Sequence, residues 1–191
     1  MADAERARED VTLDHAHACL LGELTEDRAA DFLRQLAELP QNAATLVVAV
    51  TTNGGDAELA RRIVLEVGLV RKRLGRRLVF VGKTQVHSAG VTIMSAFPRR
   101  DRYLSRDTTL LIHSRQLEKS VDVAGPMALS LPRIKALLAE MELGLRLEQE
   151  GFAALIEGSD IGMDELQRRA PESWYMTADE ALRRGLVQAL L

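Results

Sequence analysis

One serine and one histidine have side chains that together could perform acyl transfer. Ser88 lies in the segment VHSAG, between an expected strand and an apolar helix of small residues, and His113 follows 25 residues later in another apolar segment. A serine hydroxyl is a weak nucleophile unless a neighbouring base, most often histidine, takes its proton. A serine at the start of a helix is also a common N-cap. The sequence therefore leaves two roles open for Ser88, a helix cap and a nucleophile.

The residues around Ser88 favour the nucleophile. The start of a helix offers backbone N–H groups and a positive dipole end to an anionic intermediate, and Ala89 and Gly90 are small enough for a substrate carbonyl to approach. Gly54 and Gly55, in TTNGGD, could present a further N–H to a substrate oxygen. This glycine pair lacks the pattern of a phosphate loop or a dinucleotide fingerprint, so nucleotide binding there is excluded.

The other histidines point to no second site. His87 adjoins Ser88 and is expected to point elsewhere, while His15 and His17 have no partner motif. Carboxylates and histidines do not share a helix at metal-ligand spacing. We therefore expect neither a metal ion nor another cofactor.

The segments that must position Ser88 and His113 alternate between strands and helices. Strands are expected over 16–24, 45–52, 76–82, 102–105 and 108–114. Helices are expected over 25–39, 57–74, the residues after Ser88, 131–150, 163–169 and 177–185. A strand, a helix and a strand over 45–82 form a βαβ unit, which predicts an α/β fold with a parallel sheet.

The longest expected helix, 131–150, has Ser130 as its N-cap and Pro132 in its first turn. Its apolar stripe consists of Ile134, Leu137, Leu138, Met141 and Leu145. Such a stripe most often faces a core, whereas an exposed one requires a partner.

Composition limits the classes of protein. The 191 residues carry a net charge of −3 with a pI near 5.9, which argues against nucleic-acid binding. A single cysteine, Cys19, excludes an intramolecular disulfide. The start has no apolar signal segment and no apolar run is long enough to cross a membrane, so a cytoplasmic protein is expected. Residues 1–10 are expected to be a disordered end and residues 11–191 one domain.

Four motifs in order resemble the proteolytic subunit of the Clp protease, the ClpP family of serine peptidases with the ClpP/crotonase fold. TTNGGD is similar to the family's NSPGG element, VHSAG to its nucleophile motif and TTLLIHS to its MIHQP strand. WYMTADEALRRGLVQAL is similar to its C-terminal FMSAEEAxxYGLID signature. The resemblance runs from about residue 13 to the end, and it implies repeated β-β-α units with a protruding handle helix.

The resemblance also implies roles for individual residues. Ser88 would be the nucleophile and His113 the general base, with the N–H groups of Gly55 and Ala89 as the oxyanion hole. The third catalytic position falls on Ser173, where the family has an aspartate. The helix over 131–150 would join subunits into a ring or double ring, and substrates would be peptides or unfolded proteins. An AAA+ unfoldase or a paralogous subunit would be a further partner.

Three departures from the family pattern bear on activity. Ser173 cannot stabilise an imidazolium as a carboxylate does, so Ser173, its neighbour Glu172 or a water is left to orient His113. The segment before the first strand is shorter than the family's axial loops. Residues 114–129 lack the family's glycine-rich substrate strand.

Two alternatives to an active peptidase remain. One is a crotonase-type enzyme, which holds a coenzyme A thioester enolate with backbone N–H groups and does not need Ser88 and His113. The other is a catalytically weak or inactive ClpP-like subunit or scaffold, which the serine at position 173 favours.

Overall fold

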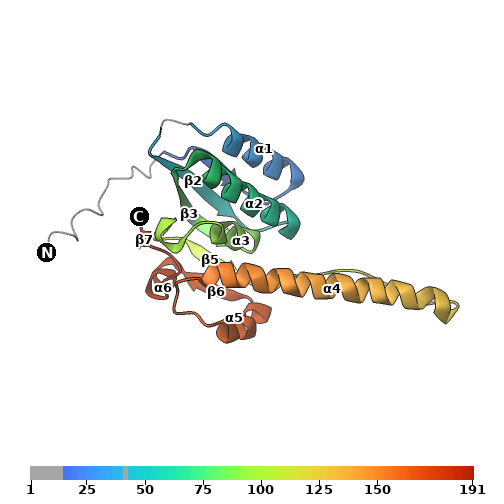
Figure 1. Ribbon diagram of the computed structural model, residues 1–191. Coiled ribbons are helices and arrows are strands. Elements are labelled where there is room, and N and C mark those ends of the chain that lie inside the picture. Colours follow the sequence, from blue (N-terminus) through green and yellow to red (C-terminus); the bar gives the residue numbers. More distant parts are fainter. Residues whose placement is uncertain (1–14, 41–42) are drawn as a thin grey trace.

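A computed structural model describes residues 15–40 and 43–191 as an α/β fold with helices against a mainly parallel sheet (Figure 1). The strands are β1 (Ala18–Leu21), β2 (Thr45–Thr52), β3 (Arg77–His87), β4 (Arg102–Leu104), β5 (Thr109–Ile112), β6 (Trp174–Thr177) and β7 (Ala189–Leu190). The helices are α1 (Glu26–Ala37), α2 (Ala57–Leu74), α3 (Ala89–Ser95), α4 (Met127–Ile156), α5 (Met163–Arg169) and α6 (Ala178–Arg183), with 3-10 turns η1 (Arg99–Asp101) and η2 (Ala170–Glu172). The predicted fold class is confirmed, while the disordered end expected over 1–10 lies outside the described residues.

The sheet runs in the order β1-β2-β3-β4-β7, with all neighbours parallel. β5 also pairs with β3 in parallel, and β6 pairs with β5 antiparallel. β2 lies inside the sheet, where Val48 pairs with Ala18 on one side and Phe80 on the other. Its β-branched residues suit a strand that is buried on both faces.

β3 is longer than predicted, because it changes partners along its length. Its first half pairs with β4, whereas Gln85–His87 pair with Thr109–Leu111 of β5; β2 pairs with both halves, as far as Val86. Thr84 has φ 60° where β3 changes partners. Lys83 and Thr84 are polar and exposed, which explains why the sequence predicts that the strand ends at residue 82. The second half of β3 carries the chain directly to Ser88.

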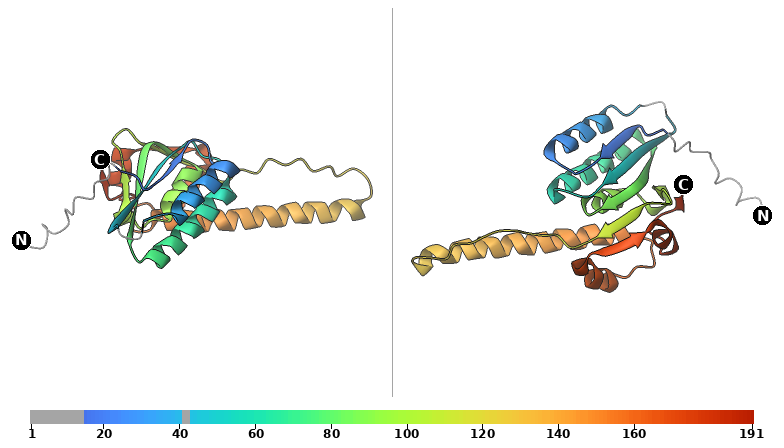
Figure 2. Two further views of the ribbon diagram at one scale, coloured as in Figure 1. Left: turned by 90° about the horizontal axis from the view of Figure 1, so that it is seen from above. Right: turned by 180° about the vertical axis from the view of Figure 1, so that it is seen from behind.

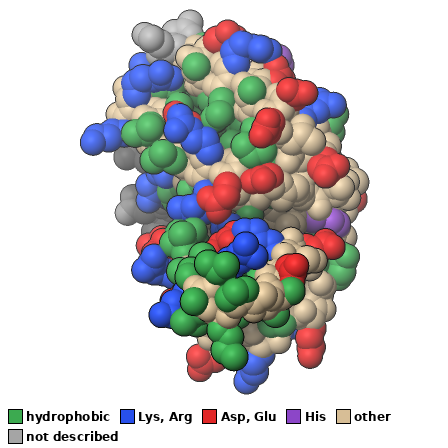
Figure 3. Space-filling view, turned by 90° about the vertical axis from the view of Figure 1, so that its right-hand side faces the viewer, with side chains coloured by type: hydrophobic (Ala, Val, Ile, Leu, Met, Phe, Trp, Pro, Cys, Tyr) green, Lys and Arg blue, Asp and Glu red, His purple; other side chains and the backbone are tan. Residues whose placement is uncertain are grey.

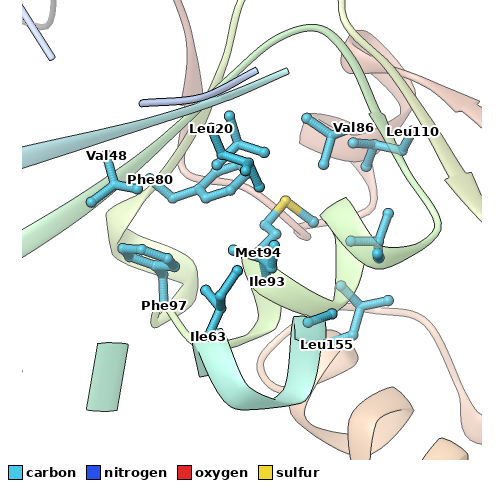
Figure 4. Packing of buried hydrophobic residues seen from close by; sticks show 14 of the residues in the cluster. Leu20, Val48, Ile63, Phe80, Val86, Ile93, Met94, Phe97, Leu110 and Leu155 are labelled. Carbon is cyan, nitrogen blue, oxygen red and sulfur yellow. The ribbon is translucent and has the colours of Figure 1, made fainter. Parts of the chain in front are cut away.

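The short helix α3 is held in place by the main hydrophobic core (Figure 4). Ile93 and Met94 of α3 are fully buried in one cluster with Val86 of β3, Leu110 of β5 and Leu155 of α4. Helix and sheet therefore form one packed unit at the point where α3 begins. Truncating such side chains typically costs a few kcal/mol, about 2–5 for a buried Leu, Ile or Met.

α4 projects far from the rest of the fold, and the chain that leads into it runs back along it (Figures 1 and 2). Lys119 forms an ion pair with Glu140, and Ser130 Oγ donates to the Val123 carbonyl oxygen at 3.2 Å. Residues 113–126 contain no strand. The segment between β5 and α4 therefore adds no strand to the sheet.

α4 begins earlier and ends later than the helix predicted over 131–150. The helix begins at Met127 rather than residue 131, so Pro132 lies inside it and Ser130 is not its N-cap. A proline costs a helix one backbone hydrogen bond and a steric clash, and is tolerated best near the start. A proline suggests that a helix starts nearby, but the residues between Pro126 and Pro132 contain no helix breaker, and the helix continues through them.

The apolar stripe of α4 does not face the core of this chain. Ile134, Leu138, Met141 and Leu145 are exposed, and Leu137 is half-buried. Figure 3 faces the projecting end of α4 and shows hydrophobic side chains gathered there. Within the described residues, no helix combines the length and the apolar character needed to cross a membrane.

A buried arginine joins the ends of two helices. Arg102 is 1% exposed and donates hydrogen bonds to carbonyl oxygens at the C-terminal ends of α3 and α4, where the helix dipole is negative. Burial lowers the pKa of its guanidinium to about 10, which leaves it charged at neutral pH. The acceptor carbonyls belong to Ser95, Phe97, Ala154, Leu155 and Leu186.

Replacing Arg102 by methionine is expected to lower the free energy of unfolding by about 3–5 kcal/mol, because buried carbonyls lose their donor. Urea denaturation would measure the loss. Arg100, whose side chain is 78% exposed, provides the control, and Arg100→Met should change stability by less than about 0.5 kcal/mol. Equal stability of the two variants would contradict a structural role for Arg102.

Candidate active site

Ser88 occupies a strained turn between β3 and α3. Its backbone has φ 53° and ψ −111°, which is rare for a residue with a side chain and costs about 1–3 kcal/mol. Its N–H donates to the Leu111 carbonyl oxygen at 2.9 Å, which ties the turn to β5. The Ser88 hydroxyl makes no capping hydrogen bond to α3. Of the two roles that the sequence leaves open, the Ser88 hydroxyl therefore does not perform that of a helix cap.

Gly54 makes room for the Ser88 side chain. A Cβ at Gly54 would lie 2.8 Å from Ser88 Cβ and 3.3 Å from Ser88 Oγ. Gly54 also has φ 116°, and its own N–H donates to Thr52 Oγ1 at 3.0 Å. Glycine is required here by both backbone conformation and space.

Gly55 directs its N–H away from the neighbouring chain. It forms a parallel bridge with Leu24, in which Leu24 N–H donates to Gly54 O and Asp56 N–H donates to Leu24 O. In this pattern the N–H of Gly55 itself points to the other side of the chain. The N–H of Ala89, at the first position of α3, likewise has no acceptor within the helix. Both predicted oxyanion-hole donors thus lie next to the turn that holds Ser88.

His113 follows the last residue of β5, and its ring is held by the main chain. Its Nδ1 lies 2.7 Å from the carbonyl oxygen of Ser114. A carbonyl oxygen only accepts hydrogen bonds, so Nδ1 must carry the proton. This tautomer leaves the lone pair on Nε2, where a general base needs it.

Ser88 and His113 line one cavity of about 360 Å³. Its walls include apolar side chains of α2, α3, β5 and α4, namely Val64, Leu65, Val91, Ile112, Leu147, Phe152 and Leu155. No hydrogen bond joins Ser88 Oγ to the His113 ring. Catalytic hydrogen bonds are often longer before substrate binds, so a shared cavity is the informative observation.

Ser173, the predicted third catalytic residue, lies beside His113 but does not hold its ring. Antiparallel pairing of Ile112 with Trp174 places Ser173 opposite His113 at the end of the β5·β6 ladder. Ser173 is exposed and has φ 61°. Within the described chain neither Ser173 nor Glu172 hydrogen-bonds to His113, whose Nδ1 partner is the Ser114 carbonyl.

Sequence reasoning missed a set of charged residues at the cavity. Arg115 pairs with Glu58 of α2, which Arg61 also contacts at 2.6 Å. Burial alone would raise the pKa of Glu58, but hydrogen bonds from Arg115 and Arg61 bring it below its usual value. The Arg115 backbone N–H donates to a carboxylate oxygen of Glu148 on α4. No motif in the sequence marks these contacts, since they join segments that are far apart.

The remaining histidines lie elsewhere. His87 Nε2 lies 2.9 Å from Thr109 Oγ1 and its ring packs edge-on against Tyr175, outside the cavity. Burial lowers the pKa of His87. His17 accepts the Val47 N–H through Nδ1. Among residues 15–40 and 43–191, no three His, Cys, Asp or Glu side chains gather as metal ligands.

Comparison with known proteins identifies the fold. No protein-family profile and no curated protein matches the sequence. Among solved structures, a mutant of ClpP1 from Listeria monocytogenes superposes with a TM-score of 0.69 over 94% of this chain and 93% of that chain. The two sequences are 18% identical, so the likeness concerns the fold. The chain has a ClpP-like fold, as its motifs predict.

Proposed function

We propose that this chain is a serine peptidase of the ClpP type, which cleaves peptides or unfolded protein segments through an acyl-enzyme on Ser88. One observation carries the proposal. Ser88 has a positive φ, and its hydroxyl caps no helix. It lines the same cavity as His113, whose Nδ1 carries the proton and whose Nε2 has a free lone pair. Strained nucleophiles on a strand-to-helix turn are a recurrent feature of serine hydrolases.

The proposed mechanism uses only groups of this chain. His113 Nε2 takes the proton of Ser88 as the oxygen attacks the substrate carbonyl, and then gives it to the leaving amine. The N–H groups of Gly55 and Ala89 stabilise the negative oxygen that forms. A water then attacks the acyl-enzyme carbonyl while His113 Nε2 takes its proton. His113 gives that proton to Ser88 Oγ as the acyl group leaves. The apolar walls of the cavity suit an apolar substrate side chain beside the cleaved bond.

Hydrolysis of a dye-labelled denatured protein, compared between wild type and His113→Ala, tests the proposal. We expect slow cleavage by the wild type and none by the variant. Turnover of a coenzyme A thioester that survives Ser88→Ala would instead favour a crotonase-type enzyme. Absence of both activities in the assembled protein would favour an inactive subunit or scaffold.

We further propose that α4 joins copies of this chain into a ring or double ring, since its stripe would otherwise remain in water. Sedimentation velocity should show a large assembly that Leu138→Glu and Met141→Glu together break down. A stable monomer of the wild type at micromolar concentration would refute the assembly.

A carboxylate at position 173 should increase activity. Asp tolerates the positive φ of Ser173 and would lie opposite His113, where it could stabilise the imidazolium. We expect Ser173→Asp to raise kcat/KM by about tenfold, because loss of such a carboxylate elsewhere costs up to about 10⁴-fold. Ser173→Asn has the same shape without the charge and should give no gain. Equal effects of Asp and Asn would count against an electrostatic role.

A further inference from the structure

The peptide group between Ser114 and Arg115 connects His113 to a carboxylate on another element. Its C=O accepts a hydrogen bond from His113 Nδ1 at 2.7 Å, and its N–H donates to Glu148 of α4. In a trans peptide the C=O and N–H point in opposite directions. The imidazole, the peptide group and the carboxylate therefore form one continuous chain of hydrogen bonds.

We propose that Glu148 is a positioning residue for His113, which acts through this peptide group instead of touching the ring. The proposal rests on the peptidase function above and names the group that replaces the missing catalytic aspartate. A carboxylate at the N–H end polarises the peptide and makes its carbonyl a stronger acceptor. This favours the imidazolium that forms when Nε2 takes the Ser88 proton. The Nδ1 proton stays on the ring, and no proton passes to Glu148.

The surroundings of Glu148 leave its charge available for this role. Glu148 is half-buried and lines the same cavity as His113. Arg115 and Arg61 also line this cavity, and the guanidinium groups of both pair with Glu58 of α2. Within the described residues, neither forms an ion pair with Glu148. Among the described residues that line the cavity, the other acidic one is Glu150, also on α4.

The test is the pKa of His113 in wild type and Glu148→Gln, followed by NMR of the histidine Cε1–H signals. The chain has four histidines, and His113→Asn identifies the signal that belongs to His113. Loss of a negative charge disfavours the imidazolium, so Glu148→Gln should lower the pKa of His113 by about half a unit or more. Acylation of Ser88 should slow by about tenfold, the usual effect of losing a hydrogen bond to a charged group.

Glu150→Gln is the matched control, since it removes a carboxylate that lines the same cavity without contacting the peptide group. The change that Glu150→Gln causes in the pKa of His113 measures the effect of losing a nearby charge without losing the hydrogen bond. This change should be clearly smaller than the one caused by Glu148→Gln. Equal shifts, or no shift in Glu148→Gln, would overturn the proposal. Ser173→Asp should restore more activity in Glu148→Gln than it adds to the wild type, because either carboxylate can serve the same ring. Equal gains in both backgrounds would also overturn it.

One measurement needs only the wild-type protein, so it does not depend on whether a variant folds. The Arg115 amide proton should be protected from exchange with solvent by its hydrogen bond to Glu148, and rapid exchange would refute the contact. The outcome is distinguishable from failure of the proposed function. If Ser88 is never acylated but Glu148→Gln still lowers the pKa of His113, the hydrogen-bond chain stands and the peptidase function falls.

Discussion

Replacing Ser88 by alanine is expected to abolish peptide hydrolysis, with a loss of about 10⁶-fold relative to an intact nucleophile and base. The reason is that no other hydroxyl occupies the turn between β3 and α3, and the acyl-enzyme cannot form without it. Stability should change little, because the Ser88 hydroxyl caps no helix in this fold. Peptide hydrolysis and thermal denaturation of the same preparation would measure both quantities.

Ser105 offers a control for this variant, since it also directly follows a strand, β4, and lies outside the cavity. Its hydroxyl bonds to Asp107 and Thr108, so Ser105→Ala should cost some stability and keep activity. The opposite pattern, with Ser88→Ala active or strongly destabilised, would mean that Ser88 is a structural residue.

Gly55→Ala should damage both folding and activity. A Cβ at Gly55 would lie 2.4 Å from Leu24 O and 2.8 Å from Leu24 N, and these main-chain atoms cannot move aside as a side chain can. Together with φ 138°, the clash should lower the free energy of unfolding by about 2–4 kcal/mol. Displacing the Gly55 N–H should lower kcat by about 10²–10³-fold, as loss of an oxyanion donor does elsewhere.

Gly22→Ala separates the two causes. Gly22 also has a positive φ, 89°, but a Cβ there would meet nothing within 4 Å. This variant should lose only about 1–2 kcal/mol of stability through backbone strain and should retain activity. Urea denaturation and steady-state hydrolysis would compare the stability and the activity of Gly55→Ala and Gly22→Ala. If Gly55→Ala behaves like Gly22→Ala in both measurements, the N–H of Gly55 has no place in the oxyanion hole.

The sequence predicted the elements whose signals are local. The run of β-branched residues in β2 and the capping residue Thr25 of α1 follow from residue types at fixed spacing, and both agree with the structure. The extension of β3 to His87 depends on pairing with β5, which lies more than 20 residues away in sequence. Pairing partners of this kind override a local polar stretch.

The site shows the same division between local and distant signals. Ser88 and His113 stand out by residue type, and the parallel order of β3 and β5 brings their ends together. The positive φ of Ser88 and the hydrogen bond from His113 to the Ser114 carbonyl involve the main chain, which carries no sequence signature. Glu148 reads as one of several charged residues on a helix, and only its contact with the Arg115 N–H distinguishes it.

The central claim is that Ser88 is a nucleophile activated by His113, and covalent labelling with a fluorophosphonate tests it most directly. Mass spectrometry of the digested wild type should find a single adduct on the peptide that contains Ser88, and His113→Ala should lose it. An unlabelled wild-type assembly, an adduct on another residue, or equal labelling of His113→Ala would contradict the account.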